Sequence, residues 1–344
     1  MKRLVLLVLL LLVSVTGGGS AQSAPDTIIF TWSRNPESLF VDFASTTTAS
    51  YAMAPIYNGL VGKDIAGNDI PELAESWEVS DDQLTWTFHL REGVLWHDGE
   101  PFTADDVKFS FEFPADPAYQ GSAFDDSIAG AAEKLAGEAT EISGIQVIDD
   151  YTISFTTNEP IALFLGTTAQ RYIVPEHVLG SLPVAELGTS SQIREPIGTG
   201  PFRVVSFTPD ESIIYARFDE YWGEPAKVAN YIWRIIPDGS VQITELLNGN
   251  IDIVPEVPAD EFDLRETSEG ITALQLPGVN TPQLLLNQNQ PFFADARARQ
   301  ALFYAIDREG LVAAVAGGRG SIYDTLTHPS LPEFNADLTP YPYD

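Results

Sequence analysis

Histidine and carboxylate side chains, the groups that bind metals and transfer protons, gather in one stretch of the chain, Leu84–Phe109. This stretch contains two of the four histidines, His89 and His97. A metal site needs three or four such ligands around one point, and acid–base chemistry needs a histidine within hydrogen-bonding reach of its partner. The carboxylates of the stretch are Glu92, Asp98, Glu100, Asp105 and Asp106.

The spacing of these residues favours structural roles. His89 lies on the polar face of a strand predicted from the alternation in "LTWTFHL", whereas His97 lies in "WHDG", a tight-turn sequence. Asp105 and Asp106 follow Thr103, which predicts a capping box at the start of a helix. The HExxH pattern of zinc enzymes and the calcium-loop pattern are both absent. We therefore expect no metal, no cofactor and no catalytic residue.

The rest of the sequence offers few catalytic motifs. GxSxG and the phosphate-binding GxxxxGK[ST] are absent, and "IGTGPF" at residues 197–202 lacks the later glycine of a dinucleotide loop. We interpret "IGTGPF" as a rigid turn that leads into the next strand. A secreted hydrolase that uses His89 or His97 with nearby carboxylates stays open as an alternative.

The composition indicates a globular, strongly acidic protein of about two domains. Its 344 residues carry 18 Lys and Arg against 49 Asp and Glu, a formal net charge of −31. Such a charge repels phosphate backbones and anionic lipid headgroups, which argues against nucleic acid or a membrane surface as a partner. Cysteine is absent, so we expect no disulfide, no thiolate metal ligand and no lipoprotein cysteine.

The N-terminus has the pattern of a secretory signal peptide over residues 1–24. A basic start precedes an apolar run, Leu4–Val13, and small residues follow it. The run is shorter than the roughly 20 residues that a transmembrane helix needs. We expect cleavage between Ala21 and Ala24 and a free periplasmic protein.

Periodicity predicts a mixed α and β fold. Alternating apolar residues indicate strands, and capping residues indicate helix starts. "FRVVSFTPDESIIYARF" predicts a hairpin that turns at Pro209 and Asp210. The predicted strands are 27–33, 84–90 and 151–157, and the predicted helices run from Thr103 to Glu112, onward from Asp295, and from Asp307 to Gly317.

Five segments form an ordered set: "ELAESWEVSDDQLTWTFHLREGVLWHDGEPFTADDVKFSFE", "EPIGTGPFRV", "FDEYWGEPAKVANYIWRIIPD", "ELLNGNIDIV" and "LLLNQNQPFFADARARQALFYAIDREGLV". They resemble successive motifs of the family 5 extracellular solute-binding proteins, the oligopeptide, dipeptide and nickel receptors of bacterial ABC importers. The resemblance runs from about Thr27 to the end of the chain. It implies an α/β, two-lobed fold like that of periplasmic binding proteins, which closes over a ligand and catalyses no reaction.

The resemblance also implies a domain plan. Residues 25–57 and 186–273 would form the sheet domain of the first lobe, 58–185 a smaller inserted domain, and 274–344 the start of the second lobe. Members of the family continue beyond the "AIDREGLV" helix, so we expect a complete first lobe and an incomplete second lobe in a C-terminally truncated chain. The family's main specificity residues lie in the missing part and do not transfer to this chain.

Aromatic and polar residues remain near the implied cleft. Arg34 could pair with a ligand carboxylate while aromatic rings pack against apolar groups. The structural alternatives are the core for Trp32 and Tyr57, and a turn for Asn287. Arg34 could equally be a solvated charge. The candidate ligand-binding residues are Trp32, Arg34, Asn35, Tyr57 and Asn287, with Ser33 and Tyr51 beside them.

The function that follows is a periplasmic receptor, monomeric at full length, that captures dipeptides or oligopeptides and delivers them to the permease subunits of an ABC importer. An oligosaccharide or a nickel chelate is an alternative ligand within the same family. A holdase-like or remnant protein that kept only the first lobe is a further alternative.

Overall fold

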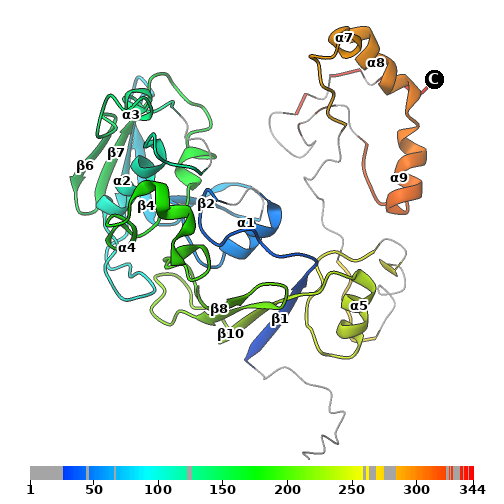
Figure 1. Ribbon diagram of the computed structural model, residues 1–344, viewed down its shortest axis with the longest axis horizontal. Coiled ribbons are helices and arrows are strands. Elements are labelled where there is room, and N and C mark those ends of the chain that lie inside the picture. Colours follow the sequence, from blue (N-terminus) through cyan, green and yellow to red (C-terminus); the bar gives the residue numbers. More distant parts are fainter. Residues whose placement is uncertain are drawn as a thin grey trace, which may run out of the picture. The chain divides into compact units, whose positions relative to one another are not determined.

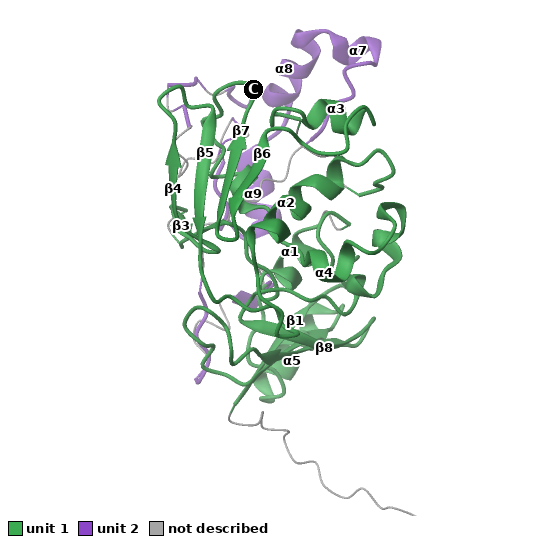
Figure 2. Cartoon of the chain, turned by 90° about the vertical axis from the view of Figure 1, so that its left-hand side faces the viewer, with its two compact units in different colours: residues 1–255 green, residues 256–344 purple. Residues whose placement is uncertain are grey.

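The computed structural model (Figure 1) describes residues 26–43, 46–65, 67–121, 126–258, 261–262, 269–274 and 284–322, with shorter pieces at 325, 327, 334–335, 337–339 and 341–344. The chain divides into two compact units, Met1–Pro255 and Glu256–Asp344 (Figure 2). The signal peptide expected at 1–24 lies outside the described residues. No described helix is long and apolar enough to cross a membrane.

The first sheet of unit 1 joins two parts of the sequence that lie far apart (Figure 1). Its strands, in spatial order, are β1 (Thr27–Trp32), β10 (Asn230–Ile235), β9 (Ser212–Arg217) and β8 (Phe202–Thr208). β1 runs parallel to β10, and the other neighbours are antiparallel. β8 and β9 therefore confirm the predicted hairpin. Helix α1 (Thr47–Met53) contributes to the same core, where the Tyr215 hydroxyl donates to Ala52 O at 3.0 Å.

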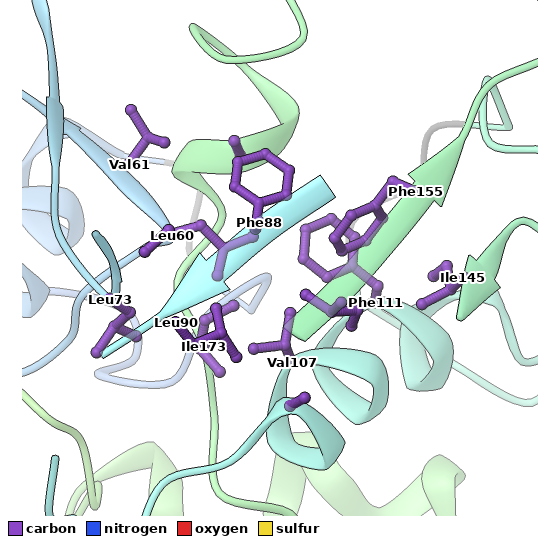
Figure 3. Packing of buried hydrophobic residues seen from close by; sticks show 14 of the residues in the cluster. Leu60, Val61, Leu73, Phe88, Leu90, Val107, Phe111, Ile145, Phe155 and Ile173 are labelled. Atoms are coloured by element: carbon purple, nitrogen blue, oxygen red, sulfur yellow. The ribbon is translucent and has the colours of Figure 1, made fainter. Parts of the chain in front are cut away.

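The second sheet is antiparallel throughout and packs against helix α2 (Ala104–Glu112). Val107 and Phe111 of α2 are buried in its core, and the Phe111 ring lies 4.8 Å from that of Phe155 (Figure 3). Unit 1 thus has two hydrophobic cores, one for each of the two four-stranded sheets. The strands in spatial order are β4 (Ala74–Val79), β5 (Thr85–Leu90), β7 (Thr152–Thr156) and β6 (Ile145–Asp149).

Strand β5 has the alternation that the sequence predicts. Phe88 and Leu90 are buried in the core, and the ring of Trp86, two residues earlier, stacks on that of Phe164 at 5.2 Å. His89 and Thr87 belong to the other face, because successive side chains of a strand point to opposite sides. The stretch 84–109, with its histidines and carboxylates, therefore begins with a strand whose apolar side chains are part of the core.

The helix starts predicted from capping residues are confirmed. Thr103 and Asp106 form the reciprocal capping box of α2. Asp295 accepts from the Arg297 N–H at the start of α8 (Ala296–Ala305). Asp307 accepts from the Gly310 N–H at the start of α9 (Arg308–Ala316), which ends at Gly317 in the left-handed conformation. No residue of α8 or α9 is buried.

Shorter elements connect these parts. In unit 1 they are β2 (Val61–Lys63), β3 (Asp69–Pro71), η1 (Phe113–Ala115), α3 (Ala131–Leu135), η2 (Thr168–Gln170), α4 (Glu176–Leu179), η3 (Val184–Thr189), η4 (Ser191–Ile193) and α5 (Gly239–Leu247), and in unit 2 α7 (Pro291–Ala294). The structure divides after Pro255, ahead of the boundary expected at 273/274. The assignment of the segments to lobes stays a prediction.

Candidate functional site

The end of β1 carries a group of four aromatic side chains, which we call the Trp32 group: Phe30, Trp32, Tyr51 and Trp233. The Trp32 ring stacks on Phe30 at 5.8 Å between centroids and meets Tyr51 edge-on at 5.4 Å. Trp32 itself is 7% exposed, whereas Tyr51 is 51% exposed. Tyr51 is therefore the member of the group that solvent reaches most.

Hydrogen bonding fixes Trp32 but not Trp233. The indole Nε1–H of Trp32 donates to Thr48 Oγ1 of α1 at 3.0 Å. Trp233, fully buried, lies 4.9 Å from Phe30, and its Nε1 has no hydrogen-bond partner among the described residues. A buried donor without an acceptor costs about 1 to 3 kcal/mol. Trp233 and Thr48 were not among the residues predicted from the sequence. The signal for Trp233 is the alternation in "YIWRI".

The loop after β1 holds the next two candidates, which differ sharply. The Arg34 side chain is exposed and makes no hydrogen bond or ion pair within the described part of the chain. Asn35 instead uses both ends of its side-chain amide on Asp210, the turn residue of the β8–β9 hairpin. Arg34 is thus a cation open to solvent, and Asn35 is a residue that fixes the hairpin to the loop.

Tyr57 lies in the core and not on a surface. It is 2% exposed, its hydroxyl donates to Leu39 O at 3.2 Å, and its ring stacks on Tyr172 at 5.7 Å. Burial raises the pKa of its hydroxyl far above the usual range. Tyr57 could be a cleft residue or a core residue. Its burial, its hydrogen bond to Leu39 O and its stacking on Tyr172 place it in the core.

Asn287 belongs to unit 2 and forms a turn. Its side-chain Oδ1 accepts from the Asn289 N–H at 3.0 Å, and its backbone O accepts from the Gln290 N–H at 3.1 Å. Its side chain is exposed. These are the bonds expected of the turn-forming alternative. Within unit 1, the structure brings Trp32, Arg34 and Asn35 together along one short segment.

His97, in the stretch 84–109, bonds to the backbone, and His177, outside it, contacts a carboxylate of the stretch. Both ring nitrogens of His97 contact backbone groups of Gly198 and Gly200, which leaves neither nitrogen for proton transfer to a substrate. His177 Nε2 lies 2.9 Å from Asp98 Oδ2. Among the residues that the structure describes, no group of three or more His, Cys, Asp or Glu side chains is placed to hold a metal.

Asp106, the most buried carboxylate of the stretch, is a hub of hydrogen bonds. Its Oδ2 accepts from the Thr103 N–H at 3.0 Å and from the Trp96 Nε1–H at 3.3 Å, and its Oδ1 accepts from the Glu176 N–H at 2.9 Å. Burial raises its pKa, and these hydrogen bonds oppose that shift. Asp106 therefore joins the WHDG turn, α2 and α4.

Taken together, these contacts suit capture better than catalysis. Tyr51 of the Trp32 group offers an exposed aromatic ring, and Arg34, two residues after Trp32, offers an exposed positive charge. These two features can hold an apolar group and an anionic group of one ligand. In the stretch 84–109, His97 and Asp106 are engaged in hydrogen bonds that hold the fold. The neighbourhood of β1 is therefore the candidate site.

Comparison with known proteins gives a consistent result. Residues 70–344 match the family model for bacterial extracellular solute-binding proteins, family 5 Middle. The chain is 33% identical over 350 residues to the dipeptide-binding protein of Escherichia coli, which covers 97% of this chain and 63% of that protein. It is 30% identical over 310 residues to heme-binding protein A of Haemophilus influenzae, covering 87% of this chain and 56% of that protein.

Solved structures are similar as well. NikZ from Campylobacter jejuni in complex with Ni(L-His) matches with a TM-score of 0.78 and 25% identity, over 94% of this chain and 61% of that one. DppA from Helicobacter pylori in complex with the peptide STSA matches with a TM-score of 0.75 and 26% identity, over 92% of this chain and 64% of that one. These matches confirm the predicted α/β, periplasmic-binding-protein-like fold. The chain spans less than two thirds of the length of each of these relatives.

Proposed function

The chain belongs to family 5 of the bacterial extracellular solute-binding proteins, and from that premise we propose that it captures dipeptides or oligopeptides for an ABC importer. In this role it binds and releases its ligand without changing it, and it delivers the ligand to permease subunits in the membrane. The partners are therefore a peptide and a permease, with no nucleic acid among them.

The observation that carries this proposal is the 33% identity to a dipeptide-binding protein over 97% of this chain. Because the match extends over nearly all of the chain, it includes the loop after β1 and the Trp32 group. A second relative of known structure, DppA from Helicobacter pylori, was solved with a peptide bound.

The chemistry at the end of β1 supports a peptide ligand. A guanidinium such as that of Arg34 pairs well with the carboxylate of a peptide C-terminus, often through two parallel hydrogen bonds. Tyr51 offers an exposed aromatic ring that can pack against a side chain of any sequence. In this proposal Trp32 and Asn35 do not bind the ligand but hold the site in shape, since the side chains of both are hydrogen-bonded within the protein.

A metal chelate is the second candidate ligand, because NikZ, with a TM-score of 0.78, was solved with Ni(L-His). In such a complex the histidine ligand supplies a carboxylate that Arg34 could bind. Heme is a third, from the similarity to heme-binding protein A. An oligosaccharide remains a candidate for the Trp32 group alone, since sugars stack on aromatic rings.

We propose the periplasm as the place of action, with export by the signal peptide at residues 1–24 and release as a monomer. N-terminal sequencing of protein from the periplasm of a Gram-negative host should find a first residue between Gln22 and Pro25. An intact Met1 in the exported protein would contradict this part of the proposal.

Native mass spectrometry of protein purified without denaturation tests the ligand class. An added mass that matches bound peptides, together with the release of peptides when the protein unfolds, supports the proposal. A retained nickel–histidine complex, heme or sugar would replace it with the corresponding alternative. Calorimetric titration with dipeptides, oligopeptides and Ni(L-His) then ranks the ligands on the same preparation.

A further inference from the structure

The imidazole of His97 is enclosed by a backbone segment that follows it by about a hundred residues. The Gly198 N–H donates to His97 Nδ1 at 3.2 Å, and His97 Nε2 lies 3.0 Å from Gly200 O. The backbone N–H of His97 also donates to Gly198 O at 3.0 Å. Because Nδ1 accepts, the ring proton is on Nε2 and is donated to Gly200 O. A neutral imidazole satisfies both contacts.

The other side of this glycine segment is pressed against the backbone that leaves α1. The Gly200 N–H donates to Ile56 O at 2.8 Å. A Cβ atom at Gly198 would lie 2.0 Å from Ile56 O, and one at Gly200 would lie 2.5 Å from Pro55 O. Glycine is therefore required at both positions. We call His97, Gly198, Gly200, Pro55 and Ile56 the His97 junction.

The His97 junction connects the two four-stranded sheets of unit 1. His97 lies in the turn that follows β5 of the second sheet, and Gly200 lies two residues before β8 of the first sheet. Each sheet has its own hydrophobic core, so polar contacts such as these contribute to holding the two together. The Phe218 ring, just after β9, meets the imidazole edge-on at 5.0 Å.

We propose that the His97 junction is an acid-sensitive connection between the two four-stranded sheets, complete only while the imidazole is neutral and weakened when the ring is protonated. Protonation from solvent adds a proton to Nδ1, which then faces the Gly198 N–H, donor against donor. That hydrogen bond is lost, and a positive charge is left in a partly buried place. The Nε2–H bond to Gly200 O survives this step.

The charges around the ring are of both signs. Arg203 of β8 disfavours protonation, whereas Asp98 of the same turn favours it, and Asp98 itself contacts His177 of α4. Burial, the largest effect, lowers the pKa of His97 from 6.5 to about 4. Because the folded pKa is lower than the unfolded one, this group's contribution to stability is complete above about pH 6.5 and is lost as the pH falls towards 4.

Nitrogen NMR of the wild-type imidazoles tests the geometry directly. We expect His97 to show the tautomer with the proton on Nε2 at neutral pH and to titrate at about pH 4. A His97 protonated on Nδ1 at neutral pH, or one that titrates near 6.5, would overturn the proposal. This measurement needs no variant, so it holds even if substitutions prevent folding.

Urea unfolding of the full chain between pH 7 and 4 tests the consequence. His97→Gln keeps an uncharged N–H that can reach Gly200 O, but its side chain does not titrate. Between pH 7 and 4 the ratio of folded to unfolded protein should therefore fall roughly a hundredfold further in the wild type than in His97→Gln. His89→Gln is the matched control, because it removes a histidine from β5 of the same stretch and leaves the junction intact. Parallel curves for wild type and His97→Gln would contradict the proposal, as would a change in His89→Gln of the size expected for His97→Gln.

Discussion

Asn35 and Asp210, which are 175 residues apart, are joined by two hydrogen bonds. The Asn35 Nδ2–H donates to Asp210 Oδ1 at 2.6 Å, and the Asp210 N–H donates to Asn35 Oδ1 at 2.8 Å. Asp210 has a φ of 62°, in the left-handed region that residues with a Cβ rarely adopt. The amide of Asn35 therefore supports a strained turn and fixes the hairpin to the loop that carries Arg34.

Asn35→Ala should lower the free energy of unfolding by about 1 kcal/mol, because it removes both hydrogen bonds at a solvent-accessible position. Urea unfolding followed by circular dichroism measures the change. Arg34→Ala is the adjacent control and should change stability by less than about 0.5 kcal/mol, since its side chain is exposed. Equal stability of Asn35→Ala and the wild type would show that the pair contributes nothing to folding.

Strand β5 offers a test of the second core. Phe88 is fully buried, 5.8 Å from Phe155 and 6.3 Å from Phe164 between ring centroids. Phe88→Ala should therefore cost about 3 to 5 kcal/mol, because it removes a buried ring and leaves a cavity. Thr87→Ala, on the opposite face of the same strand, should cost less than about 1 kcal/mol. Similar losses in the two variants would mean that both faces of β5 are packed alike.

Asp106 and Asp105 provide a matched pair of neighbouring carboxylates. Asp106→Asn keeps the shape but turns an N–H₂ group towards backbone and indole donors, so we expect a loss of about 2 to 3 kcal/mol. Asp105→Asn makes the same chemical change on an exposed residue of the first turn and should cost less than about 1 kcal/mol, through the helix dipole alone. A small effect of Asp106→Asn would show that the hub at Asp106 is dispensable.

Local signals predicted several of the elements, though not all of them. The alternation in "LTWTFHL" and the capping residues Thr103, Asp295 and Asp307 act within a few residues of the structures they start, and each prediction agrees with the structure. The absence of a zinc pattern around His97 also follows from spacing. What the sequence could not supply was the partner of each polar group.

Those partners lie far along the chain. His97 contacts Gly198 and Gly200 across more than a hundred residues, and no local pattern near "WHDG" predicts these contacts. Tyr57 is of a residue type that often lines ligand clefts. Its ring nevertheless stacks on Tyr172, which only the folded chain brings beside it. Residue type and order predict local structure, whereas contacts between distant segments depend on the packing of whole sheets.

The role of Arg34 can be tested with paired ligands on the full chain. If its guanidinium binds the carboxylate of a peptide, Arg34→Ala should raise the dissociation constant of a free-acid peptide about tenfold or more, since a hydrogen bond to a charged group contributes about 1.5 to 3 kcal/mol. The same peptide with an amidated C-terminus should bind the wild type more weakly and should respond little to the substitution. Isothermal titration calorimetry measures all four combinations.

The control for that cycle is a second exposed cation. The chain has a formal net charge of −31, so removing any positive charge changes the long-range attraction or repulsion of a charged ligand. Lys227→Ala, also at an exposed position, removes one charge without touching the loop after β1 and should leave both affinities within about twofold. If Arg34→Ala weakens the acid and amide peptides equally, or if Lys227→Ala reproduces its effect, Arg34 does not bind the carboxylate and its exposed guanidinium is only a solvated charge.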